Sequence, residues 1–384
     1  MHICHCYKNF QLSGGGVEQI IIDLSREYIK EGHTVSILTS WTQGQPVNET
    51  IEGIKVFRTR PLFTVFKVPI MPKYYKCLNN IGADIIQAHA TVPGVSDIAV
   101  LFAHNTGKPC AIYYHFDGNA DSIIGTLFAN IYNSIINPIV ISMANKTTAT
   151  SRSYAETSPV LKKHRDMIEI MPNCADMNEF NPNINKEHIC EKYGLPDKHI
   201  VLFVGRFVKY KGLEYLIRAM EYVQKGTLVV VGTGPQEEYL RRLIKRQKLQ
   251  NVIFVGHIAH DELPKLYRAS DVYVLPAITR GENFGISALE AMACGIPVVA
   301  SDFPWMRELV KESCGFTVQP KNIMGLAEAI NQLLDDENLR IRMGEAARKN
   351  AMKYNSRDIA VRFIRIYEDL IKESKLKLAA GVID

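Results

Sequence analysis

Short apolar runs alternate with longer amphipathic segments along the chain, a pattern typical of strands that alternate with helices. The first run, Ile3 to Tyr7, predicts a buried strand. A glycine-rich turn follows it, then an amphipathic helix from Val17 to Glu31, and Gly32 ends that helix. Further strands are predicted at residues 34–40, 84–89, 110–115 and 146–151. The opening of the chain is therefore expected to be a series of β-α-β units.

A second series of strands and helices follows a loop rich in Pro, Asn and charged residues, and we place the domain junction near Asn173. Strands are predicted at residues 200–205, 227–232, 252–256, 272–276 and 297–301. Helices are predicted to begin at Leu213, after Pro235, at Glu262 and near Gly285. One more amphipathic helix is expected from Ser356 to Leu376.

This alternation predicts the α/β class, with two Rossmann-like domains that each contain a parallel, doubly wound sheet. We expect domains at residues 1–172 and 173–355, and a C-terminal helical segment, 356–384, that returns to the first domain. Two such domains in tandem are expected to form a cleft where the carboxyl ends of both sheets face each other. Ligands bind at that edge of open α/β sheets, so we expect the site there.

Composition narrows the function classes. With 384 residues, 47% of them apolar, the chain can bury two cores, and its net charge of +5 is too mild to indicate a nucleic-acid binder. The apolar segment from Ile123 to Met143 contains Asn137 and Pro138, which favours a buried or interfacial helix over a membrane span. Residues 1–10 lack the pattern of a signal peptide, so we expect a cytoplasmic protein.

The eight cysteines are scattered and include no C-x-x-C pair, so we expect reduced thiols and neither a zinc ribbon nor a disulfide framework. His2, Cys4 and Cys6 would share one face of the first strand. They are too few for a structural zinc site, and buried cysteine in a core strand is the commoner arrangement. We therefore predict no metal site.

Two loops in the predicted strand-helix turns carry residues suited to anions. Gly14, Gly15 and Gly16 precede the first helix, where glycine lets backbone N–H groups approach an anion, although a tight turn alone also explains them. In the second domain, Arg206 and Lys211 follow a strand, and their cations would suit a diphosphate; a solvated charged loop is the alternative.

The segment RGENFGISALEAMACGIPVVAS contains two glutamates with different expected roles. Glu282 lies in a loop at the mouth of a predicted helix, where it can meet a sugar hydroxyl. Glu290 lies within that helix and can accept hydrogen bonds from a ribose diol. Spacing alone has little value, but the Gly-containing helix start at a strand's carboxyl end favours a ligand site.

Histidines end two of the predicted strands in the first domain. His89 follows DIIQA and His115 follows CAIYY, so both are expected near the cleft, where one could touch substrate. A satisfied structural histidine is the alternative for either. Asp117 lies close enough in sequence to orient the ring of His115 or to bind a hydroxyl.

Seven segments in order resemble the retaining glycosyltransferases of the GT-B fold, particularly glycosyltransferase family 4, over nearly the whole chain. They are GGGVEQIIIDLSREYIKEGHTVSILTS, DIIQAH, IMPNCADMNEFNP, VLFVGRFVKYKG, VVGTGP, LYRASDVYVLPA and ENFGISALEAMACGIPVVAS. The resemblance implies that the first domain binds the acceptor and the second binds a nucleotide diphosphate sugar, with no cofactor.

The resemblance also implies roles for individual residues. Arg206 and Lys211 would hold the diphosphate, Glu282 and the N–H groups of Phe284 and Gly285 would contact the transferred sugar, Glu290 would hold the ribose, and His115 would lie against the sugar. The donor-binding set is Gly14, Gly15, Gly16, Arg206, Lys211, Glu282, Asn283, Phe284, Gly285 and Glu290. Asn283 stands where glycine or serine often precedes Phe-Gly, which leaves donor choice open.

No D-x-D triplet occurs, so we expect protein cations, and no divalent metal, to stabilise the departing diphosphate. The family implies retention through an oxocarbenium-like state, with the departing phosphate taking the acceptor's proton and no dedicated base. The expected substrate is a UDP- or GDP-hexose, and the expected acceptor is a glycan or lipid-linked acceptor of envelope synthesis. The alternatives are a non-catalytic nucleotide-sugar-binding subunit and a sugar phosphorylase or epimerase of the same architecture.

Residues 53–83 interleave basic and aromatic side chains without any acid, which would suit an anionic membrane surface. The predicted surface comprises Lys55, Phe57, Arg58, Arg60, Phe63, Phe66, Lys67, Lys73, Tyr74, Tyr75 and Lys76. A basic loop over an ordinary core is the alternative.

Overall fold

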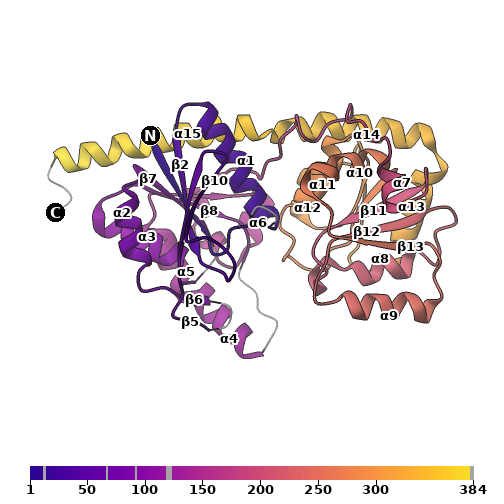
Figure 1. The fold of residues 1–384 in the computed structure, drawn as a ribbon, viewed down its shortest axis with the longest axis horizontal. Coiled ribbons are helices and arrows are strands. Elements are labelled where there is room, and N and C mark those ends of the chain that lie inside the picture. Colours follow the sequence, from indigo (N-terminus) through magenta and orange to yellow (C-terminus); the bar gives the residue numbers. More distant parts are fainter. Residues whose placement is uncertain (12–13, 66–67, 91–92, 118–122, 381–384) are drawn as a thin grey trace. The chain divides into compact units, whose positions relative to one another are not determined.

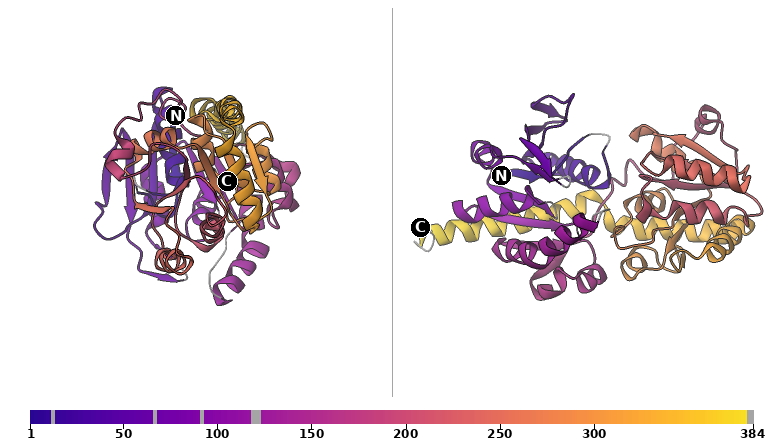
Figure 2. Two further views of the ribbon diagram at one scale, coloured as in Figure 1. Left: turned by 90° about the vertical axis from the view of Figure 1, so that its right-hand side faces the viewer. Right: turned by 90° about the horizontal axis from the view of Figure 1, so that it is seen from below.

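The computed structural model describes residues 1–384 except 12–13, 66–67, 91–92, 118–122 and 381–384. The chain divides into two compact units (Figure 1). Unit 1 comprises Met1–Pro172 and Ser356–Asp384, and unit 2 comprises Asn173–Asn355. Each unit is built on its own sheet, with helices on both faces (Figures 1 and 2).

Unit 1 contains an eight-stranded sheet with the order β10-β9-β8-β7-β1-β2-β4-β3. All neighbouring pairs are parallel except β3 with β4 at one edge. The strands are β1 (His2–Cys6), β2 (Thr34–Ser40), β3 (Asn48–Ile51), β4 (Ile54–Thr59), β7 (Ile85–Ala90), β8 (Cys110–Tyr114), β9 (Lys146–Ala149) and β10 (Ile168–Ile170). A separate antiparallel pair consists of β5 (Phe63–Val65) and β6 (Val68–Ile70).

The helices of unit 1 pack on its sheet or on one another. They are α1 (Gly16–Lys30), α2 (Tyr74–Ile81), α3 (Ser96–Thr106), α4 (Ile123–Ile131), α5 (Asn137–Met143), α6 (Arg152–Thr157) and α15 (Ser356–Ala379), with short turns η1 (Tyr132–Ile136), η2 (Leu161–Lys163) and η3 (Arg165–Met167). The last helix, α15, packs on α1, where the Tyr28 and Tyr367 hydroxyls lie 3.4 Å apart.

The apolar segment from Ile123 to Met143 is helical. We expected a buried or an interfacial helix, and full burial is wrong because apolar side chains on its outer face are exposed. Leu127 is 61% exposed and Ile139 is 52% exposed. The turn η1 is a π-helix that lies directly before Asn137 and Pro138, the first two residues of α5. Proline carries no N–H group, so the regular helical hydrogen bonds are interrupted there.

Unit 2 contains a six-stranded parallel sheet with the order β13-β12-β11-β14-β15-β16. The strands are β11 (Ile200–Val204), β12 (Thr227–Val231), β13 (Val252–Gly256), β14 (Val272–Leu275), β15 (Val298–Ser301) and β16 (Gly315–Val318). Val201, Phe203, Leu228 and Val230 are fully buried in its core. The β-branched valines and the aromatic Phe203 favour strands, and near-continuous apolar runs suit strands that are covered on both faces.

The helices of unit 2 lie on both sides of that sheet (Figure 1). They are α7 (Ile189–Tyr193), α8 (Leu213–Ala219), α9 (Glu237–Gln247), α10 (Leu263–Ala269), α11 (Ile286–Ala293), α12 (Pro304–Leu309), α13 (Ile323–Asp335) and α14 (Glu337–Ala351), with turns η4 (Lys209–Lys211), η5 (His260–Glu262) and η6 (Met352–Tyr354). The predicted fold class, two α/β units with doubly wound parallel sheets, is confirmed.

Candidate functional site

The candidate site of unit 2 lies where the strand order reverses. β11 is flanked by β12 on one side and β14 on the other, so the loops after β11 and β14 leave neighbouring strands at the carboxyl edge. Open α/β sheets bind ligands at such a switch point. The loop after β11 carries Arg206 and Lys211, and the segment between β14 and α11 carries Glu282 to Gly285.

A close backbone contact holds these two loops together. Gly212 has a φ of +68°, and a Cβ atom at this position would lie 2.0 Å from the carbonyl oxygen of Pro276. Next to it, the Ile278 N–H group donates to the Tyr210 carbonyl oxygen over 2.8 Å. Only glycine permits this approach, so Gly212 fixes the loop that carries Lys211 against the loop after β14.

Lys211 and Glu282, which the sequence predicted as separate ligand contacts, form an ion pair with each other. The Lys211 ammonium donates to Glu282 Oε2, and the two side chains are only 14% and 9% exposed. The other carboxylate oxygen of Glu282 accepts from the Gly285 N–H group over 3.0 Å. The indole N–H of Trp305 donates to the Glu282 carbonyl oxygen over 2.7 Å, which fixes the loop backbone.

The ion pair sets the charge state of this site. Burial by itself would lower the pKa of Lys211, but the neighbouring Glu282 carboxylate outweighs burial and the pKa is raised. Lys211 therefore stays cationic at neutral pH. Arg206 is exposed, and no ion pair joins it to another residue in the described part of the chain. Arg206 can therefore bind an incoming anion directly. Lys211 can bind the anion only after its ammonium group leaves the Glu282 carboxylate.

Glu290 lies on α11, inside the protein, and its carboxylate is unusually basic. Burial raises its pKa to about 7, although the Tyr267 hydroxyl, which donates to Oε2 over 2.7 Å, favours the ionised form. Nearby, His260 Nε2 lies 3.0 Å from Glu179 Oε1. Glu290 thus holds a proton more readily than an ordinary glutamate, and when ionised it can accept hydrogen bonds from a ligand's hydroxyl groups.

Phe284 and Asn283 differ in what they can offer a ligand. The Phe284 ring is buried and meets the Tyr354 ring edge-on, with ring centroids 5.6 Å apart, so it belongs to the core. Its backbone N–H group is the part that can serve a ligand. Asn283 is half-buried. Gly285 has a φ of +86° and precedes α11, and its N–H group already serves Glu282.

In unit 1, the glycine-rich turn leads into α1 as predicted. Gly15 caps the helix and Gly16 is its first residue. A Cβ atom on Gly14 would lie 2.7 Å from Glu18 Cγ and 2.8 Å from the Gln11 carbonyl oxygen, so tight packing already requires glycine there. Residues 12–13, in the same turn, lie outside the described residues.

His115 directly follows β8, at its carboxyl end as predicted, and Asp117, two residues later, binds hydroxyl groups of the protein itself. The Asp117 carboxylate accepts hydrogen bonds from the Tyr114 hydroxyl at 2.8 Å and the Ser158 hydroxyl at 2.6 Å. The His115 ring stacks on the ring of His89, and His115 Nε2 lies 2.8 Å from His89 Nδ1. His89 is fully buried and His115 is only 2% exposed, so both rings lie inside unit 1.

The metal interpretation of the first strand gains no support. Cys4 and Cys6 are fully buried core residues, and the His2 ring is bonded to the Ser36 hydroxyl over 2.7 Å. Among the residues that the structure describes, no three His, Cys, Asp or Glu side chains are grouped as metal ligands.

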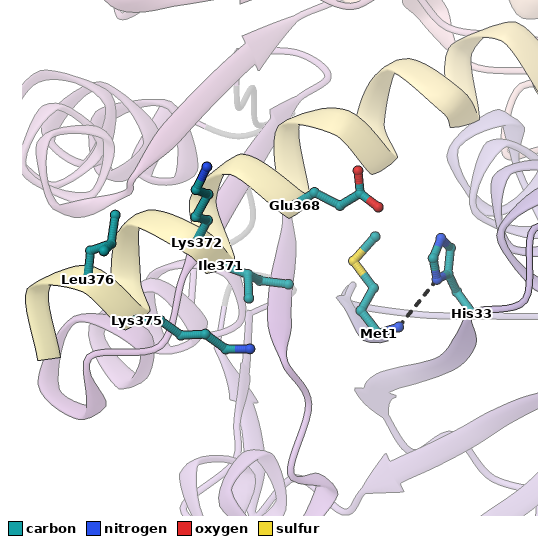
Figure 3. A pocket seen from close by; sticks show the side chains of 7 residues that line it. All are labelled: Met1, His33, Glu368, Ile371, Lys372, Lys375 and Leu376. Carbon is teal, nitrogen blue, oxygen red and sulfur yellow. Dashed lines mark hydrogen bonds between the residues drawn. The ribbon is translucent and has the colours of Figure 1, made fainter. Parts of the chain in front are cut away.

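A groove of about 470 Å³ lies in unit 1, where the start of the chain meets α15 (Figure 3). Met1 and His33 line one side, and their amino group and ring nitrogen lie 3.3 Å apart. Glu368 and Lys372 line the helix side. None of the residues predicted as a site from the sequence lines this groove, so it is separate from the candidate site.

The predicted membrane surface at residues 53–83 is partly wrong. Arg58 is buried, pairs with Glu49 and donates to the Pro46 carbonyl oxygen, and Tyr74 is fully buried. Phe66 and Lys67 lie outside the described residues. Lys55, Arg60, Lys73 and Lys76 remain exposed together with Phe63 and Tyr75, whereas Phe57 is half-buried.

The sequence did not predict several residues that belong to the candidate site or to an exposed apolar surface. Trp305 and Tyr267 hold the two glutamates from distant positions in the chain, and no local pattern marks them. The exposed apolar side chains Leu127, Phe128, Ile131, Ile135, Ile136 and Ile139 had a sequence signal, because no charged residue lies between Asp121 and Lys146. No helix in the described ranges is long and apolar enough to cross a membrane.

Comparison with known families and sequences gives a consistent result. Residues 185–350 match the family described as Glycosyl transferases group 1, and residues 14–179 match the one described as Glycosyltransferase Family 4. An uncharacterized glycosyltransferase of Methanocaldococcus jannaschii is 30% identical, over 92% of this chain and 94% of its own. The O-antigen chain mannosyltransferase C of Escherichia coli is 26% identical, over 98% of this chain and all of its own.

Solved structures share the fold. Sucrose-phosphate synthase from Thermosynechococcus elongatus superposes with a TM-score of 0.79 at 24% identity, covering 97% of this chain and 99% of its own. The Anabaena HepE protein in complex with UDP-glucose superposes with a TM-score of 0.76 at 20% identity, covering 96% of this chain and all of its own.

Proposed function

Because the chain belongs to the GT-B glycosyltransferases and resembles glycosyltransferase family 4, we propose that it transfers a hexose from a UDP- or GDP-sugar with retention of anomeric configuration. The acceptor in this proposal is a glycan or lipid-linked molecule of cell-envelope polysaccharide or glycoconjugate synthesis. The E. coli relative, an O-antigen mannosyltransferase, supports this acceptor class. The UDP-glucose complex of a structural neighbour supports a nucleotide sugar as donor.

The single observation that carries the proposal is the buried Lys211–Glu282 pair at the switch point of unit 2. In the proposed donor complex, Lys211 turns from Glu282 to the diphosphate, and Arg206 binds the same group with its planar guanidinium. Glu282 is then released to accept hydrogen bonds from the transferred sugar. Glu290 accepts from the ribose diol.

The proposed reaction is an electrostatic one. As the bond from sugar to phosphate breaks, negative charge grows on the diphosphate, and Lys211, Arg206 and the positive end of α11 stabilise it. The acceptor hydroxyl attacks the same face of the sugar and passes its proton to the departing phosphate. No residue is assigned as general base, and no divalent metal takes part.

A donor screen followed by a turnover assay tests this proposal. Wild-type protein is melted with UDP-glucose, UDP-N-acetylglucosamine, GDP-mannose and ADP-glucose, since a ligand at 100 times its Kd stabilises by about 2.7 kcal/mol. Release of nucleotide diphosphate is then measured with the stabilising donor, in EDTA and with Mg²⁺ or Mn²⁺. Activity in EDTA supports the proposal, and activity that returns only with a metal contradicts the metal-independent chemistry.

Other outcomes of these assays would favour the alternative functions or test the stereochemistry. Donor binding without any turnover, unchanged by Glu282→Ala, would favour the non-catalytic binding subunit. Turnover that needs inorganic phosphate, or isomerises the sugar without an acceptor, would favour a phosphorylase or epimerase. The anomeric coupling constant of the product in NMR tests retention, and an inverted configuration contradicts it.

We also propose peripheral contact between unit 1 and an anionic membrane. The exposed cations Arg60, Lys73 and Lys76 lie in the same stretch as the exposed rings of Phe63 (58% exposed) and Tyr75. Each cation close to an anionic bilayer contributes about 1 kcal/mol, and aromatic rings settle at the headgroup level. The exposed apolar face of α4, η1 and α5 offers a second lipid-facing surface.

Vesicle flotation tests this contact. Anionic phosphatidylglycerol vesicles should carry the protein and neutral phosphatidylcholine vesicles should carry less, because the cations supply the difference. Lys73→Glu with Lys76→Glu should abolish that difference, whereas Lys198→Glu, an exposed lysine of unit 2, should leave it unchanged. Equal flotation with both vesicle types, or none with either, would contradict the electrostatic contact.

A further inference from the structure

The ion pair of Lys211 and Glu282 lies between the end of β11 and the start of α11. A Cβ atom on Gly205, the residue after β11, would lie 3.7 Å from Lys211 Nζ, so the ammonium group lies at the carboxyl edge of the sheet. Glu282 belongs to the segment before α11, and its Oε1 accepts from the Gly285 N–H group next to that helix. The pair therefore occupies the place in unit 2 at which an open α/β sheet binds ligands.

The backbone is held in place around both members of the pair. A hydrogen bond and a close contact to the loop after β14 hold Tyr210 and Gly212, the residues on either side of Lys211. The Trp305 indole holds the Glu282 backbone. The flexible four-carbon side chain of Lys211 can rotate without breaking any of these contacts. The pair can therefore separate by rotation of the lysine side chain while the Glu282 carboxylate stays in the site.

Separation of the pair leaves a buried charge without its partner. Among the described residues, Lys211 is the one side chain that donates to the Glu282 carboxylate, and the Gly285 N–H group is the one backbone donor. When the ammonium group moves to an anion, Glu282 Oε2 loses its donor, and the side chain is only 9% exposed. A buried carboxylate without its partner is unfavourable. An anion that binds Lys211 must therefore bring a new partner for Glu282, or it binds more weakly.

We propose that the Lys211–Glu282 pair makes unit 2 discriminate between the sugar donor and the nucleotide diphosphate product. This inference rests on the proposed function, which places the diphosphate at Lys211 and the transferred sugar at Glu282. A nucleotide sugar satisfies both groups, because its diphosphate accepts from the ammonium group and its hydroxyl groups donate to the carboxylate. A nucleotide diphosphate without a sugar binds the ammonium group and leaves the carboxylate unpaired.

The same pair promotes release of the product. After transfer, the sugar hydroxyl groups leave Glu282 together with the glycoside. The carboxylate then competes again with the diphosphate for the Lys211 ammonium group. The ion pair re-forms as the nucleotide diphosphate leaves, so the site returns to the state that favours a new donor.

Calorimetric titration with UDP, GDP and inorganic pyrophosphate, without any sugar, tests the discrimination. Glu282→Gln keeps the size of the side chain and removes its charge, so Lys211 is no longer held by a carboxylate. The full-length variant should bind these ligands about 10- to 100-fold more tightly than wild type, the equivalent of one hydrogen bond between charged groups. Glu328→Gln, an exposed position on α13, should bind them like wild type.

A double-mutant cycle distinguishes the ion pair from simple charge repulsion. The Glu282 charge also repels an anion directly, and that repulsion does not need Lys211. In a Lys211→Ala background, Glu282→Gln should therefore tighten binding by at most about 3-fold, the scale of interactions between charges that are not paired. Equal tightening in both backgrounds would overturn the inference. Glu282→Ala, for which the same tightening is expected, replaces Glu282→Gln if that variant does not fold.

The outcomes distinguish this inference from the proposed function. If wild type is active and Glu282→Gln binds the nucleotide diphosphates no more tightly, the discrimination is wrong and the proposed function stands. If Glu282→Gln tightens binding in a protein without transferase activity, the discrimination stands and the proposed reaction is wrong. Failure of all three ligands to bind any variant contradicts both. With the residual activity of Glu282→Gln, the inhibition constant of the nucleotide diphosphate should fall by the same factor as its Kd, and an unchanged constant contradicts the role in product release.

Discussion

Glu290→Gln should make the stability of unit 2 less dependent on pH. The amide keeps the size of the carboxyl group and can still meet the Tyr267 hydroxyl, but it does not titrate. In the wild type the carboxyl group is buried, and its pKa of about 7 in the folded protein compares with 4.5 for an ordinary glutamate. Folding therefore favours the protonated form of Glu290.

The size and sign of the effect on the free energy of unfolding follow from the difference between the two pKa values of Glu290. Each pKa unit is worth about 1.4 kcal/mol, so a rise from 4.5 to about 7 corresponds to about 3 kcal/mol. Between these two pH values the folded state binds a proton that the unfolded state has lost. The free energy of unfolding of the wild type should therefore fall, relative to the Gln variant, as pH rises from 4.5 through 7.

Urea unfolding at pH 5, 6, 7 and 8 measures this difference. Trp41→Phe in both proteins leaves Trp305 of unit 2 as the fluorescent reporter. The stability of Glu290→Gln minus that of wild type should increase by up to about 3 kcal/mol across the series. Glu328→Gln, at an exposed helix position, serves as the control and should give a flat difference. A flat or falling difference for Glu290→Gln would refute the reasoning.

Two more predictions concern the loops of unit 2. Lys211→Ala should lower kcat/KM about 10²- to 10³-fold, roughly 3 kcal/mol of transition-state stabilisation, and Arg206→Lys should also impair transfer because a lysine loses the two-pronged fit to phosphate. Near wild-type rates for Lys211→Ala, with folding checked by circular dichroism, would mean that another group stabilises the leaving diphosphate. Gly212→Ala should lower the melting temperature more than Gly256→Ala does. Both glycines have positive φ, but a Cβ at Gly212 meets the Pro276 carbonyl whereas one at Gly256 meets nothing within 4 Å, so equal effects would contradict the close-contact argument.

The order of the elements could be predicted because each depends on local sequence. The run from Ile85 forms β7, and the helix predicted from Val17 begins one residue earlier, at Gly16. The Gly-containing helix start that the sequence placed after a strand is found there, since Gly285 directly precedes α11, the helix that follows β14.

Contacts between distant residues could not be predicted. Arg58 alternates with apolar neighbours in a basic stretch, and nothing local indicates that Glu49, on the adjoining antiparallel strand, neutralises it inside the protein. No local pattern marks His5, because its neighbours His2, Cys4 and Cys6 occupy the opposite face of the same strand. Its partner, His89, is 84 residues away and is recognised only through the register of β1 and β7.

The path of the chain has a consequence for how the protein is made. Unit 2 is a continuous stretch, whereas unit 1 is interrupted after Pro172 and completed only by α15. During synthesis, unit 2 can therefore reach its final packing while the earlier-made unit 1 still lacks its last helix. Until α15 emerges from the ribosome, Tyr28 cannot contact Tyr367 and Tyr113 cannot contact Phe363. Unit 1, whose synthesis begins first, is therefore the unit whose packing is completed last.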